Sequence, residues 1–276
     1  MNWLITGVGS GLGRALARAA LARGDAVAGT VRARADLAAF EALAPGRARG
    51  FRLDLADGAA IAAVAGEAQE ALGRVDVLVN NAGYGLVGAL EEASPDEIRA
   101  QFEVNVFGPL ALIQAVLPAM RARRAGHIVN ITSVSGVATW AGTGIYCASK
   151  FALEGAALTL ADEIAGFGIK VTNVEPGGMR TDYSGRSLRQ AARIIDDYAA
   201  VAHAARRILA DHAGHEPGDP ARVAAAILQV VDAENPPRQL LLGADAVLYA
   251  TRHMARFQAE MGAWATLSLS TGFEGT

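Results

Sequence analysis

Short apolar runs alternate with alanine-rich segments along this chain, and the alternation constrains the fold more than any other feature. The apolar runs lie at 2–6, 26–31, 48–53, 75–80, 126–132, 169–174 and 239–242. Between them, alanine-rich segments with apolar residues at helical spacing lie at 11–23, 57–72, 109–124 and 144–166. Strands that alternate with helices in this way form parallel sheets with helices on both faces. The pattern predicts an α/β fold with about seven parallel strands.

The first apolar run ends in a cluster of glycines that precedes the first helical segment. The residues of this turn are Thr6, Gly7, Gly9, Ser10, Gly11, Leu12 and Gly13. Glycines let a ligand approach the backbone, and the start of a helix offers free N–H groups to a phosphate. We therefore interpret the turn as a binding site for the pyrophosphate of a dinucleotide. Its spacing, Gly7-x3-Gly11-x-Gly13, differs from the common G-x-G-x-x-G fingerprint.

Tyr146 and Lys150 stand four residues apart in a chain whose other lysine is Lys170. On a helix, side chains at this spacing share a face, so the ammonium can lie near the phenol. A nearby cation favours the phenolate and would lower the pKa of Tyr146 from the usual value of about 10. Ser133 lies thirteen residues before the tyrosine. The combination predicts a tyrosine that exchanges a proton near neutral pH.

Together, these motifs resemble the short-chain dehydrogenase/reductase family, in its shorter branch of simple oxidoreductases. The matching motifs are Thr6-Gly7-x3-Gly11-x-Gly13, Asn80-Asn81-Ala82-Gly83, Asn105, Ser133, Tyr146-x3-Lys150 and Pro176-Gly177. They follow the family's order from residue 6 to about residue 181. The resemblance implies a Rossmann-like, doubly wound parallel sheet in one domain spanning 1–276. It also implies reversible hydride transfer between a nicotinamide cofactor and a ketone or secondary alcohol.

The resemblance implies a catalytic group of Asn105, Ser133, Tyr146 and Lys150. Tyr146 would give a proton to the carbonyl oxygen during reduction or take it from the alcohol during oxidation. Ser133 would orient the substrate oxygen by a hydrogen bond. Lys150 would lower the pKa of Tyr146 and hold the ribose of the nicotinamide.

Two of these assignments have alternatives. Asn105 would bend its helix and hold a water near Lys150, but a buried amide bonded only to local backbone explains it as well. The family commonly has two serines where this chain has Thr132 and Ser133. The spacing to the tyrosine selects Ser133, and Ser135 is the fallback.

The end of the second apolar run bears on cofactor choice. Arg32 stands there with Arg34 and Ser10 nearby, and no Asp or Glu occupies 29–34. An enzyme that prefers NAD(H) usually places an acid here to bind the ribose hydroxyl, whereas a guanidinium suits a 2′-phosphate. We therefore predict NADP(H) in preference to NAD(H). The alternative is an Arg32 that only faces solvent.

The resemblance places further residues at the cofactor. Beyond the glycine turn, the expected set is Arg32, Asp54, Leu55, Asn81, Ala82, Gly83, Pro176, Gly177 and Thr181, together with Tyr146 and Lys150. Asp54 and Leu55 would meet the adenine, although Asp54 could equally cap a helix. Thr181 would bind the carboxamide of the nicotinamide.

Residues that follow the motif segments would line the substrate pocket. They are Tyr84, Trp140, Met179 and Tyr183. They favour an apolar or aromatic substrate, although core packing would explain them equally well. Residues 182–218 break the strand and helix rhythm, so we expect a substrate lid of one or two amphipathic helices, with a fixed surface helix pair as the alternative. Asp219 and Pro220 would start the next helix.

Composition argues against several other functions. The net charge of -3 and the scattered arginines provide no basic stripe for nucleic acid. Polar residues interrupt every apolar run before roughly eighteen residues, and the first strand begins at residue 2, so we expect neither a membrane span nor a signal peptide. The single cysteine, Cys147, suits a reducing cytoplasm and a packed position. The histidines at 203, 212 and 215 lack the ligand set of a metal site.

Two other functions remain as alternatives. Sugar-nucleotide epimerases and dehydratases also use Tyr-x-x-x-Lys, but with another glycine spacing and a longer substrate domain. A cofactor-sensing binding protein without turnover is the second alternative, against which Ser133, Tyr146 and Lys150 are all present. By resemblance, the apolar helices at 109–124 and 146–166 would pair between subunits, which predicts a homodimer or homotetramer.

Overall fold

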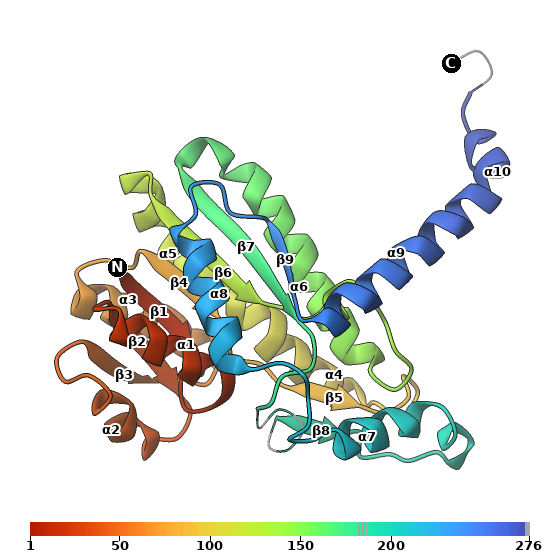
Figure 1. The fold of residues 1–276 in the computed structure, drawn as a ribbon, viewed down its shortest axis with the longest axis horizontal. Coiled ribbons are helices and arrows are strands. Elements are labelled where there is room, and N and C mark those ends of the chain that lie inside the picture. The colour runs from red at the N-terminus through yellow and green to blue at the C-terminus, as the bar shows by residue number, and fades with distance from the viewer. Residues whose placement is uncertain (182, 184, 186, 274–276) are drawn as a thin grey trace.

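A seven-stranded sheet forms the centre of the molecule (Figure 1). The computed structural model describes residues 1–181, 183, 185 and 187–273. The strands are β1 (Asn2–Thr6), β2 (Ala26–Val31), β3 (Ala48–Arg52), β4 (Val77–Asn80), β6 (Gly126–Ile131), β7 (Ile169–Pro176) and β9 (Gln239–Leu242). They lie in the order β3-β2-β1-β4-β6-β7-β9, and all of them are parallel. The predicted α/β fold with a doubly wound parallel sheet is confirmed.

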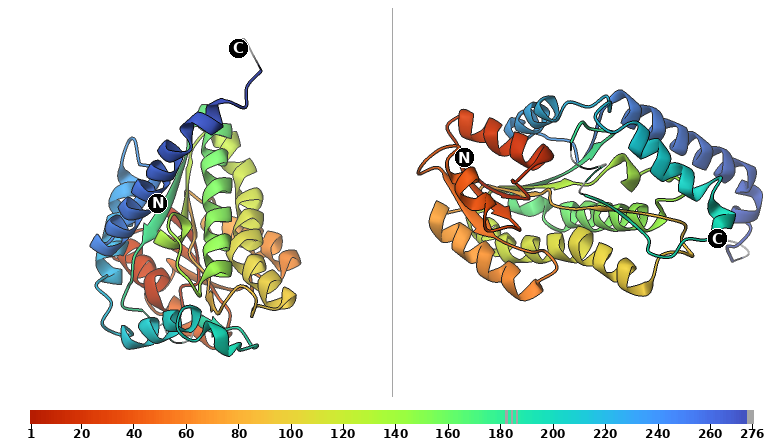
Figure 2. Two further views of the ribbon diagram at one scale, coloured as in Figure 1. Left: turned by 90° about the vertical axis from the view of Figure 1, so that its right-hand side faces the viewer. Right: turned by 90° about the horizontal axis from the view of Figure 1, so that it is seen from below.

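Helices cover both faces of the sheet (Figure 2). One face carries α1 (Gly11–Ala22) and α8 (Pro220–Asp232), and the other carries α3 (Gly58–Leu72), α5 (Gly108–Arg123) and α6 (Gly144–Glu163). Each face of the sheet has its own hydrophobic core: the first core lies under α1 and α8, and the second core lies under α3, α5 and α6. Side chains alternate along β1, so Trp3 and Ile5 pack in the first core while Leu4 packs in the second. Both faces are therefore buried, which explains why these strands are nearly continuous apolar runs.

The remaining helices are α2 (Asp36–Glu41), α4 (Pro95–Phe102), the π-helix η1 (Glu103–Phe107), α7 (Ala202–Asp211), the long α9 (Ala244–Ala263) and α10 (Ala265–Leu269). Three 3₁₀ turns are described as well, η2 (Val134–Gly136), η3 (Ala165–Phe167) and η5 (Asp196–Tyr198). A second, two-stranded parallel sheet joins β5 (Gly85–Val87) to β8 (Leu188–Gln190). We did not predict this sheet, because strands of three residues are too short to show a periodic pattern.

The strand order reverses between β1 and β4. From β1 the chain proceeds outward to β2 and β3, whereas β4 leads the other way to β6 and β7. Crossovers on the two sides leave in opposite directions, so a crevice opens at the carboxyl ends of β1 and β4, where Thr6 and Asn80 lie. Ligands of doubly wound sheets bind at this position.

Among the described residues, the continuous helical stretch Pro95–Arg123 has the length and mean hydropathy of a membrane-crossing helix. Its buried side chains Leu112, Ile113, Val116 and Met120 pack in the second core beside the sheet. Packing within the protein accounts for the apolar character of these four side chains.

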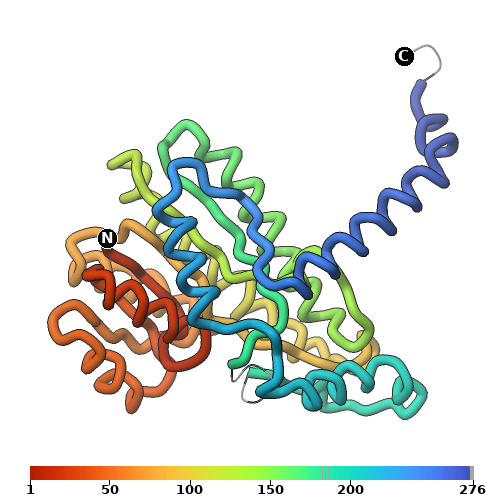
Figure 3. The backbone as a smooth tube through the Cα atoms, in the orientation of Figure 1, coloured from red at the N-terminus to blue at the C-terminus, as the bar shows by residue number. Residues whose placement is uncertain are grey.

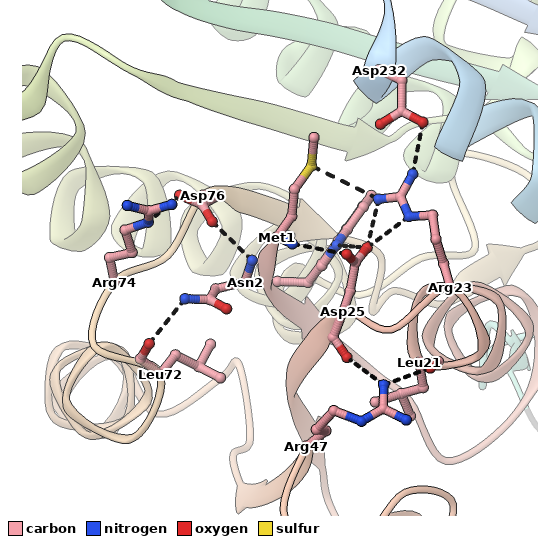
Figure 4. A network of polar contacts seen from close by, with 11 residues as sticks. Met1, Asn2, Leu21, Arg23, Asp25, Arg47, Leu72, Arg74, Asp76 and Asp232 are labelled. Carbon is pink, nitrogen blue, oxygen red and sulfur yellow. Dashed lines mark hydrogen bonds and ion pairs between the residues drawn. The ribbon is translucent and has the colours of Figure 1, made fainter.

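A polar network ties the start of β1 to two helices (Figure 4). The Met1 ammonium donates to Asp25 at 2.8 Å, and the Trp3 indole donates to the same carboxylate at 2.9 Å. Arg23 joins Asp25 to Asp232 of α8, the latter at 2.7 Å. Burial would raise the pKa of Asp25, but these hydrogen bonds hold it below its usual value. Asp25 is therefore a charged anchor at the end of the sheet away from the crevice.

Helix α9 leaves the body of the molecule and leads α10 away from it (Figures 1 and 3). Its buried residues are Ala246 and Ala250, both near its beginning. We did not single out this segment in the sequence.

Candidate active site

Three hydroxyl groups meet at Tyr146. This residue is buried near the start of α6, and its hydroxyl is hydrogen-bonded to Tyr183 and Ser133. The ring centroids of Tyr146 and Tyr183 lie 5.9 Å apart. Ser133 is fixed in turn, because its Oγ accepts the N–H of Ser135 at 3.0 Å. The structure thus brings Ser133, rather than the fallback Ser135, to the phenol.

Lys150 lies one helical turn after Tyr146 and is buried. Its Nζ is 5.7 Å from the centroid of the Tyr146 ring. The ammonium donates to the carbonyl oxygen of Ile131, at the end of β6, at 2.9 Å. Burial lowers the pKa of Lys150 to about 8, against the attraction of Glu154. The predicted pair is therefore assembled, with the ammonium bonded to backbone.

The expected effect of Lys150 on the pKa of Tyr146 is not found in this geometry. Burial raises the pKa of Tyr146, and the hydrogen bonds from Tyr183 and Ser133 offset only part of that rise. A phenolate loses the stabilisation of water in the interior, and the ammonium of Lys150 donates to the carbonyl of Ile131 instead of to the phenol. Ionisation of Tyr146 requires another positive charge or donor near the phenolic oxygen.

Asn105 sits in the π-helix between α4 and α5 and is buried. Its Nδ2 donates to the carbonyl of Tyr84 at 3.0 Å, and its Oδ1 accepts the N–H of the same residue at 3.2 Å. A Cβ placed on Gly83 would lie 3.1 Å from Asn105 Oδ1 and 3.7 Å from Lys150 Nζ. The predicted irregularity of the helix is present. The amide also donates to Ser149 Oγ of α6 at 3.1 Å, so the alternative of an amide bonded only to local backbone is wrong.

The glycine turn has the shape of a phosphate cradle. Gly7 and Gly11 have φ of 75° and 55°, a region that other residues rarely adopt. Within the described chain, the first turn of α1 contains no acidic residue, and the Ser10 side chain does not cap it. Its N–H groups and positive dipole end can therefore receive an anion. A Cβ on Gly13 would lie 2.4 Å from Asn81 Nδ2, so Gly13 permits close packing of helix and strand.

The segment after β4 forms a wall beside this turn. Thr6 Oγ1 accepts the N–H groups of Asn81 and Ala82, both at 2.9 Å. Asn81 Nδ2 donates back to the carbonyl of Thr6 at 2.7 Å. These bonds hold the predicted residues Asn81, Ala82 and Gly83 against the end of β1, next to the cradle.

The loop after β7 crosses over the glycine turn. The nearest side chain to a Cβ built on Gly11 is that of Thr181, at 3.5 Å. The loop is fastened from α9, because Gly178 N–H donates to Asp245 Oδ2 at 2.7 Å. Gly177 has no room for a side chain, since its Cβ would lie 2.3 Å from the same carboxylate. We missed Asp245 in the sequence. The one feature that could have indicated it is its position two residues after Gly243, at the end of an apolar run.

A small pocket lies between the glycine turn and α2. Its lining is Val8, Gly9, Arg14, Asp36, Ala39, Phe40 and Leu43. Asp36 Oδ2 is 3.6 Å from the position of a Cβ on Gly9, and Arg14 donates to the carbonyl of Gly9 at 3.3 Å. Arg32 and Arg34 are exposed after β2. We missed both residues: the turn before α2 decides how close Asp36 comes to Gly9, and Arg14 stands on α1 directly after the glycine turn.

The two residues predicted to meet the adenine differ in exposure. Asp54 is exposed, and its carboxylate accepts the backbone N–H two residues later at 3.0 Å. Asp57, and not Asp54, caps α3, so the cap alternative for Asp54 is wrong. The side chain of Leu55 is buried in the second core and faces Gly108, which leaves only its backbone for an adenine contact.

The other three residues predicted to line the substrate pocket make separate contacts. The Tyr84 ring lies 4.4 Å from the guanidinium of Arg189. Trp140 packs edge-on against Tyr249 of α9, with centroids 5.4 Å apart. Met179 is partly buried against the first core, so core packing, the alternative to a substrate contact, explains its side chain.

The described part of the expected lid, 182–218, is attached to the body. Positions 182, 184 and 186 lie outside the described residues. The remainder contains β8, paired with β5, and one α-helix, α7. The buried carboxylate of Glu92 accepts a hydrogen bond from Ile195 N–H and contacts His203 Nε2, each at 2.7 Å. Asp219 caps α8 with Pro220 at its first position, as predicted.

A buried polar chain crosses the sheet beside Lys150. Asn80 donates to Asn130 at 2.9 Å, Asn130 to Asn173 at 3.0 Å, and Asn173 to Glu154 at 2.5 Å. The three asparagines are register neighbours on β4, β6 and β7. We did not predict this chain of hydrogen bonds, because the asparagines lie within apolar runs.

Glu154 and Glu175 form a buried carboxyl pair at the end of this chain. Burial raises the pKa of both, and that of Glu175 reaches about 7 with the help of the Glu154 charge. Each carboxyl disfavours the negative charge of the other, because like charges repel strongly where water is excluded. Glu154 follows Lys150 by one helical turn on α6, so the pair sits directly behind the lysine.

A phosphate cradle at the switch point of a doubly wound sheet, with serine, tyrosine and lysine beside it, defines a nicotinamide-dependent oxidoreductase. Residues 2–192 match the family model described as short chain dehydrogenase. The chain belongs to the short-chain dehydrogenase/reductase family, whose members act on CH–OH and C=O groups with NAD(P).

Relatives and solved structures match almost the whole chain. Oxidoreductase BOA17 of Botryotinia fuckeliana is 37% identical over 270 residues, 98% of either chain. The 3-ketodihydrosphingosine reductase of Bacteroides thetaiotaomicron is 35% identical over 241 residues, 87% of either chain. The crystal structure of a short-chain dehydrogenase from Streptomyces avermitilis is 44% identical, with a TM-score of 0.92 over 98% of this chain and 99% of that one.

Similar structures contain both nicotinamide dinucleotides. A short-chain dehydrogenase/reductase from Burkholderia phymatum in complex with NAD is 27% identical, with a TM-score of 0.83 over 94% of each chain. A metagenomic short-chain oxidoreductase in complex with NADP is 29% identical, with a TM-score of 0.68 over 88% of this chain and 96% of that one. The cofactor is therefore of the NAD(P) class.

Proposed function

We propose that this protein transfers a hydride between NADP(H) and an apolar ketone or secondary alcohol, with Tyr146 as the general acid and base. The observation that carries the proposal is the buried phenol of Tyr146, hydrogen-bonded to Ser133 and with Lys150 Nζ 5.7 Å from its ring. The bound cofactor supplies or accepts the hydride and, when oxidised, adds a positive charge to the site.

The raised pKa of Tyr146 suits the reduction direction. A protonated phenol can donate to the substrate oxygen as negative charge develops there, and Ser133 can donate a second hydrogen bond. Tyr183 takes one hydrogen-bonding position of the Tyr146 oxygen. A ketone oxygen accepts the O–H of Tyr146 and so binds beside the Tyr183 hydroxyl, whose donated bond favours release of the Tyr146 proton.

The residues around the crevice fit the cofactor. The N–H groups at the start of α1 would bind the pyrophosphate, and the wall of Asn81, Ala82 and Gly83 would face the ribose. Thr181, already placed over Gly11, would bind the carboxamide. Lys150 would move its hydrogen bond from Ile131 to the ribose hydroxyls, which brings its charge to the phenol.

NADP(H) is favoured by the arginines beside the glycine turn. Arg14 lines the pocket next to Gly9, and Arg32 and Arg34 are exposed at the end of β2, where guanidinium groups can reach a 2′-phosphate. NAD(H) is the second candidate, because Asp36 lines the same pocket and a carboxylate binds ribose hydroxyls.

Titration of both nucleotides into two variants decides between them. In Arg32→Ala we expect NADPH to bind more weakly while NADH is unaffected. In Asp36→Asn we expect NADPH to bind at least as well as in the wild type. NADH binding that depends on Asp36, with NADPH indifferent to Arg32, would reverse the assignment.

An apolar substrate is supported by the aromatic residues near the phenol. Tyr183 contacts Tyr146, and Tyr84 lies on the segment bonded to Asn105. The relative from Bacteroides thetaiotaomicron is named for a ketone with a sphingosine skeleton, which agrees with such a pocket.

NADPH oxidation against a panel of hydrophobic ketones tests the reaction. In Tyr146→Phe we expect turnover to fall by about 10²–10⁴-fold while nucleotide binding is retained. Tyr249→Phe, a matched change outside the hydroxyl cluster, should keep its activity. Equal turnover in Tyr146→Phe and the wild type would remove the proposed acid.

We also propose a homodimer or homotetramer in which α5 and α6 pair between subunits. The exposed rings of Phe151 on α6 and Phe107 beside α5 agree with this arrangement. A protein that remains monomeric by light scattering at micromolar concentration would contradict it.

A further inference from the structure

Helix α9 carries a repeat of seven residues with apolar side chains at its first and fourth positions. The first positions are Val247, Met254 and Met261, and the fourth positions are Ala250, Phe257 and Trp264. Apolar residues thus recur at alternating steps of four and three, the pattern of a seam between two paired helices. Between residues 254 and 264, every large apolar side chain of the helix lies on this seam.

The body of the molecule covers only the beginning of the seam. Ala250 is buried there, but the five large side chains of the seam are 49–64% exposed. Figures 1 and 3 show α9 projecting beyond the sheet. A lone helix that exposes a row of methionine and aromatic side chains is unfavourable in water, so the seam is suited to a partner.

The outer face of α9 fits a protein partner better than a lipid surface. A helix that lies in a membrane interface has a wide apolar face and an excess of lysine and arginine. Here the seam is narrow, and of the two arginines of the helix, Arg252 and Arg256, the second lies 4.0 Å from the carboxylate of Glu260. Small residues, Ala255 and Ala259, occupy the opposite side.

We propose that α9 pairs with α9 of a second copy of this chain in antiparallel orientation. In such a pair, first positions of one helix face fourth positions of the other. The exposed facing pairs are Met254 with the partner's Phe257 at the centre and Val247 with the partner's Trp264 at each end. The outer pair joins a small residue to a large one, so the side chains can fill the space between the helices. Ala250 is covered by its own molecule and takes no part in the contact.

The residues that flank the seam select the antiparallel orientation. His253 and Glu260 both occupy the seventh position of the repeat, and antiparallel pairing brings seventh positions together. His253 then faces the partner's Glu260, and the same contact recurs on the other side of the twofold axis. Parallel pairing would instead set His253 beside the partner's Gln258 and Glu260 beside the partner's Ala265, which forms no charged contact.

The paired helix also connects to the active site. The first turn of α9 carries Asp245, which holds Gly178 in the loop over the glycine turn at 2.7 Å. Tyr249, one turn later, packs against Trp140. A second subunit that pairs with α9 would therefore also hold in place the helix that anchors this loop.

Multi-angle light scattering of the full-length protein at micromolar concentration tests the pairing. The seam variant Phe257→Glu/Met261→Glu introduces two charges into the proposed contact. The control, Ala255→Glu/Ala259→Glu, introduces the same charges on the opposite side of the same helix. We expect wild type and control to have equal mass and the seam variant to have half that mass, with unchanged far-ultraviolet circular dichroism. A seam variant with the wild-type mass, or a monomeric wild type, overturns the proposal.

Cross-linking tests the orientation, and vesicles test the competing partner. Differently tagged Met254→Cys and Phe257→Cys chains are mixed and oxidised, since the native Cys147 is buried. Antiparallel pairing predicts cross-links between the two kinds of chain, and predominant cross-links within one kind would refute it. Wild type that floats with phosphatidylcholine/phosphatidylglycerol vesicles, while the seam variant does not float and keeps the wild-type mass, would assign the seam to lipid instead.

Discussion

The ammonium of Lys150 donates to the carbonyl oxygen of Ile131 at 2.9 Å and so stays bonded to the end of β6. Its Nζ is 5.7 Å from the centroid of the Tyr146 ring, and burial lowers the pKa of Lys150 to about 8. Lys150 is thus mostly charged at neutral pH and loses its charge as the pH rises through about 8. In the proposed mechanism this charge has to shift from Ile131 toward the phenol and the ribose.

The pH dependence of reduction should follow this lysine. We expect kcat/KM for the ketone to be constant at neutral pH and to fall above about 8, where the free enzyme loses the charge of Lys150. In Lys150→Arg the charge persists, so the falling limb should move to higher pH, at a lower plateau. Lys170→Arg, a change at the other lysine, is the control. A limb that stays in place in Lys150→Arg would show that another group titrates there.

Removal of the Tyr183 hydroxyl should weaken the proposed acid. The hydroxyl donates to the Tyr146 oxygen and offsets part of the rise in the pKa of Tyr146, and one neutral hydrogen bond contributes about 0.5–1.5 kcal/mol. In Tyr183→Phe we expect kcat for the ketone to fall by roughly two- to tenfold with KM little changed. Steady-state kinetics measure both constants. A kcat equal to that of the wild type would show that the Tyr183 hydroxyl does not assist Tyr146.

The strands and the central motifs were predictable because each depends on residues close together in sequence. A strand buried on both faces, such as β7, must be apolar along most of its length, so its position is visible directly. Tyr146 and Lys150 share one helix, and their spacing alone places them together. Likewise Asp219 and Pro220 mark the start of α8 by local backbone chemistry.

The remaining features depend on contacts between distant segments. Glu154 and Glu175 lie on different elements, and nothing within either segment shows that their carboxyls meet. The rise in the pKa of Tyr146 comes from burial, which the whole fold determines. Asp36 reaches Gly9 only because the chain turns between β2 and α2. Local patterns therefore identify the reacting groups better than their electrostatic environment.

Asp245 should matter for the cofactor through the loop that it holds. Its carboxylate accepts the N–H of Gly178 at 2.7 Å, so Asp245→Ala frees the loop that we assign to the nicotinamide. We expect a several-fold weaker affinity for the nucleotide, with KM for the ketone changed less, since losing the bond costs about 1–3 kcal/mol shared between loop stability and binding. Nucleotide titration by fluorescence measures the loss. Asp245→Asn retains an acceptor oxygen and should restore most of the affinity, and an affinity equal to wild type in Asp245→Ala would exclude this role.

Asp25 should stabilise the fold in a pH-dependent way. Although burial opposes it, hydrogen bonds from Met1, Arg23 and Trp3 hold the pKa of this carboxyl below its usual 3.8. A depressed native pKa means that the stabilisation is complete above the unfolded value and is lost as pH falls through the native one. Asp25→Asn should therefore lower the free energy of unfolding by about 1–3 kcal/mol at pH 7. The difference from wild type should hold down to about pH 5 and shrink at more acidic pH.

Urea unfolding of wild type and variant across this pH range measures the difference. Asp232→Asn serves as the control, because Asp232 is the exposed partner of the same Arg23 and surface pairs contribute only about 0–1 kcal/mol. If the Asp25→Asn deficit stayed constant far below pH 4, the charge of Asp25 would not be its source. The loss would then belong to the packing of Trp3 and the chain terminus around the altered side chain.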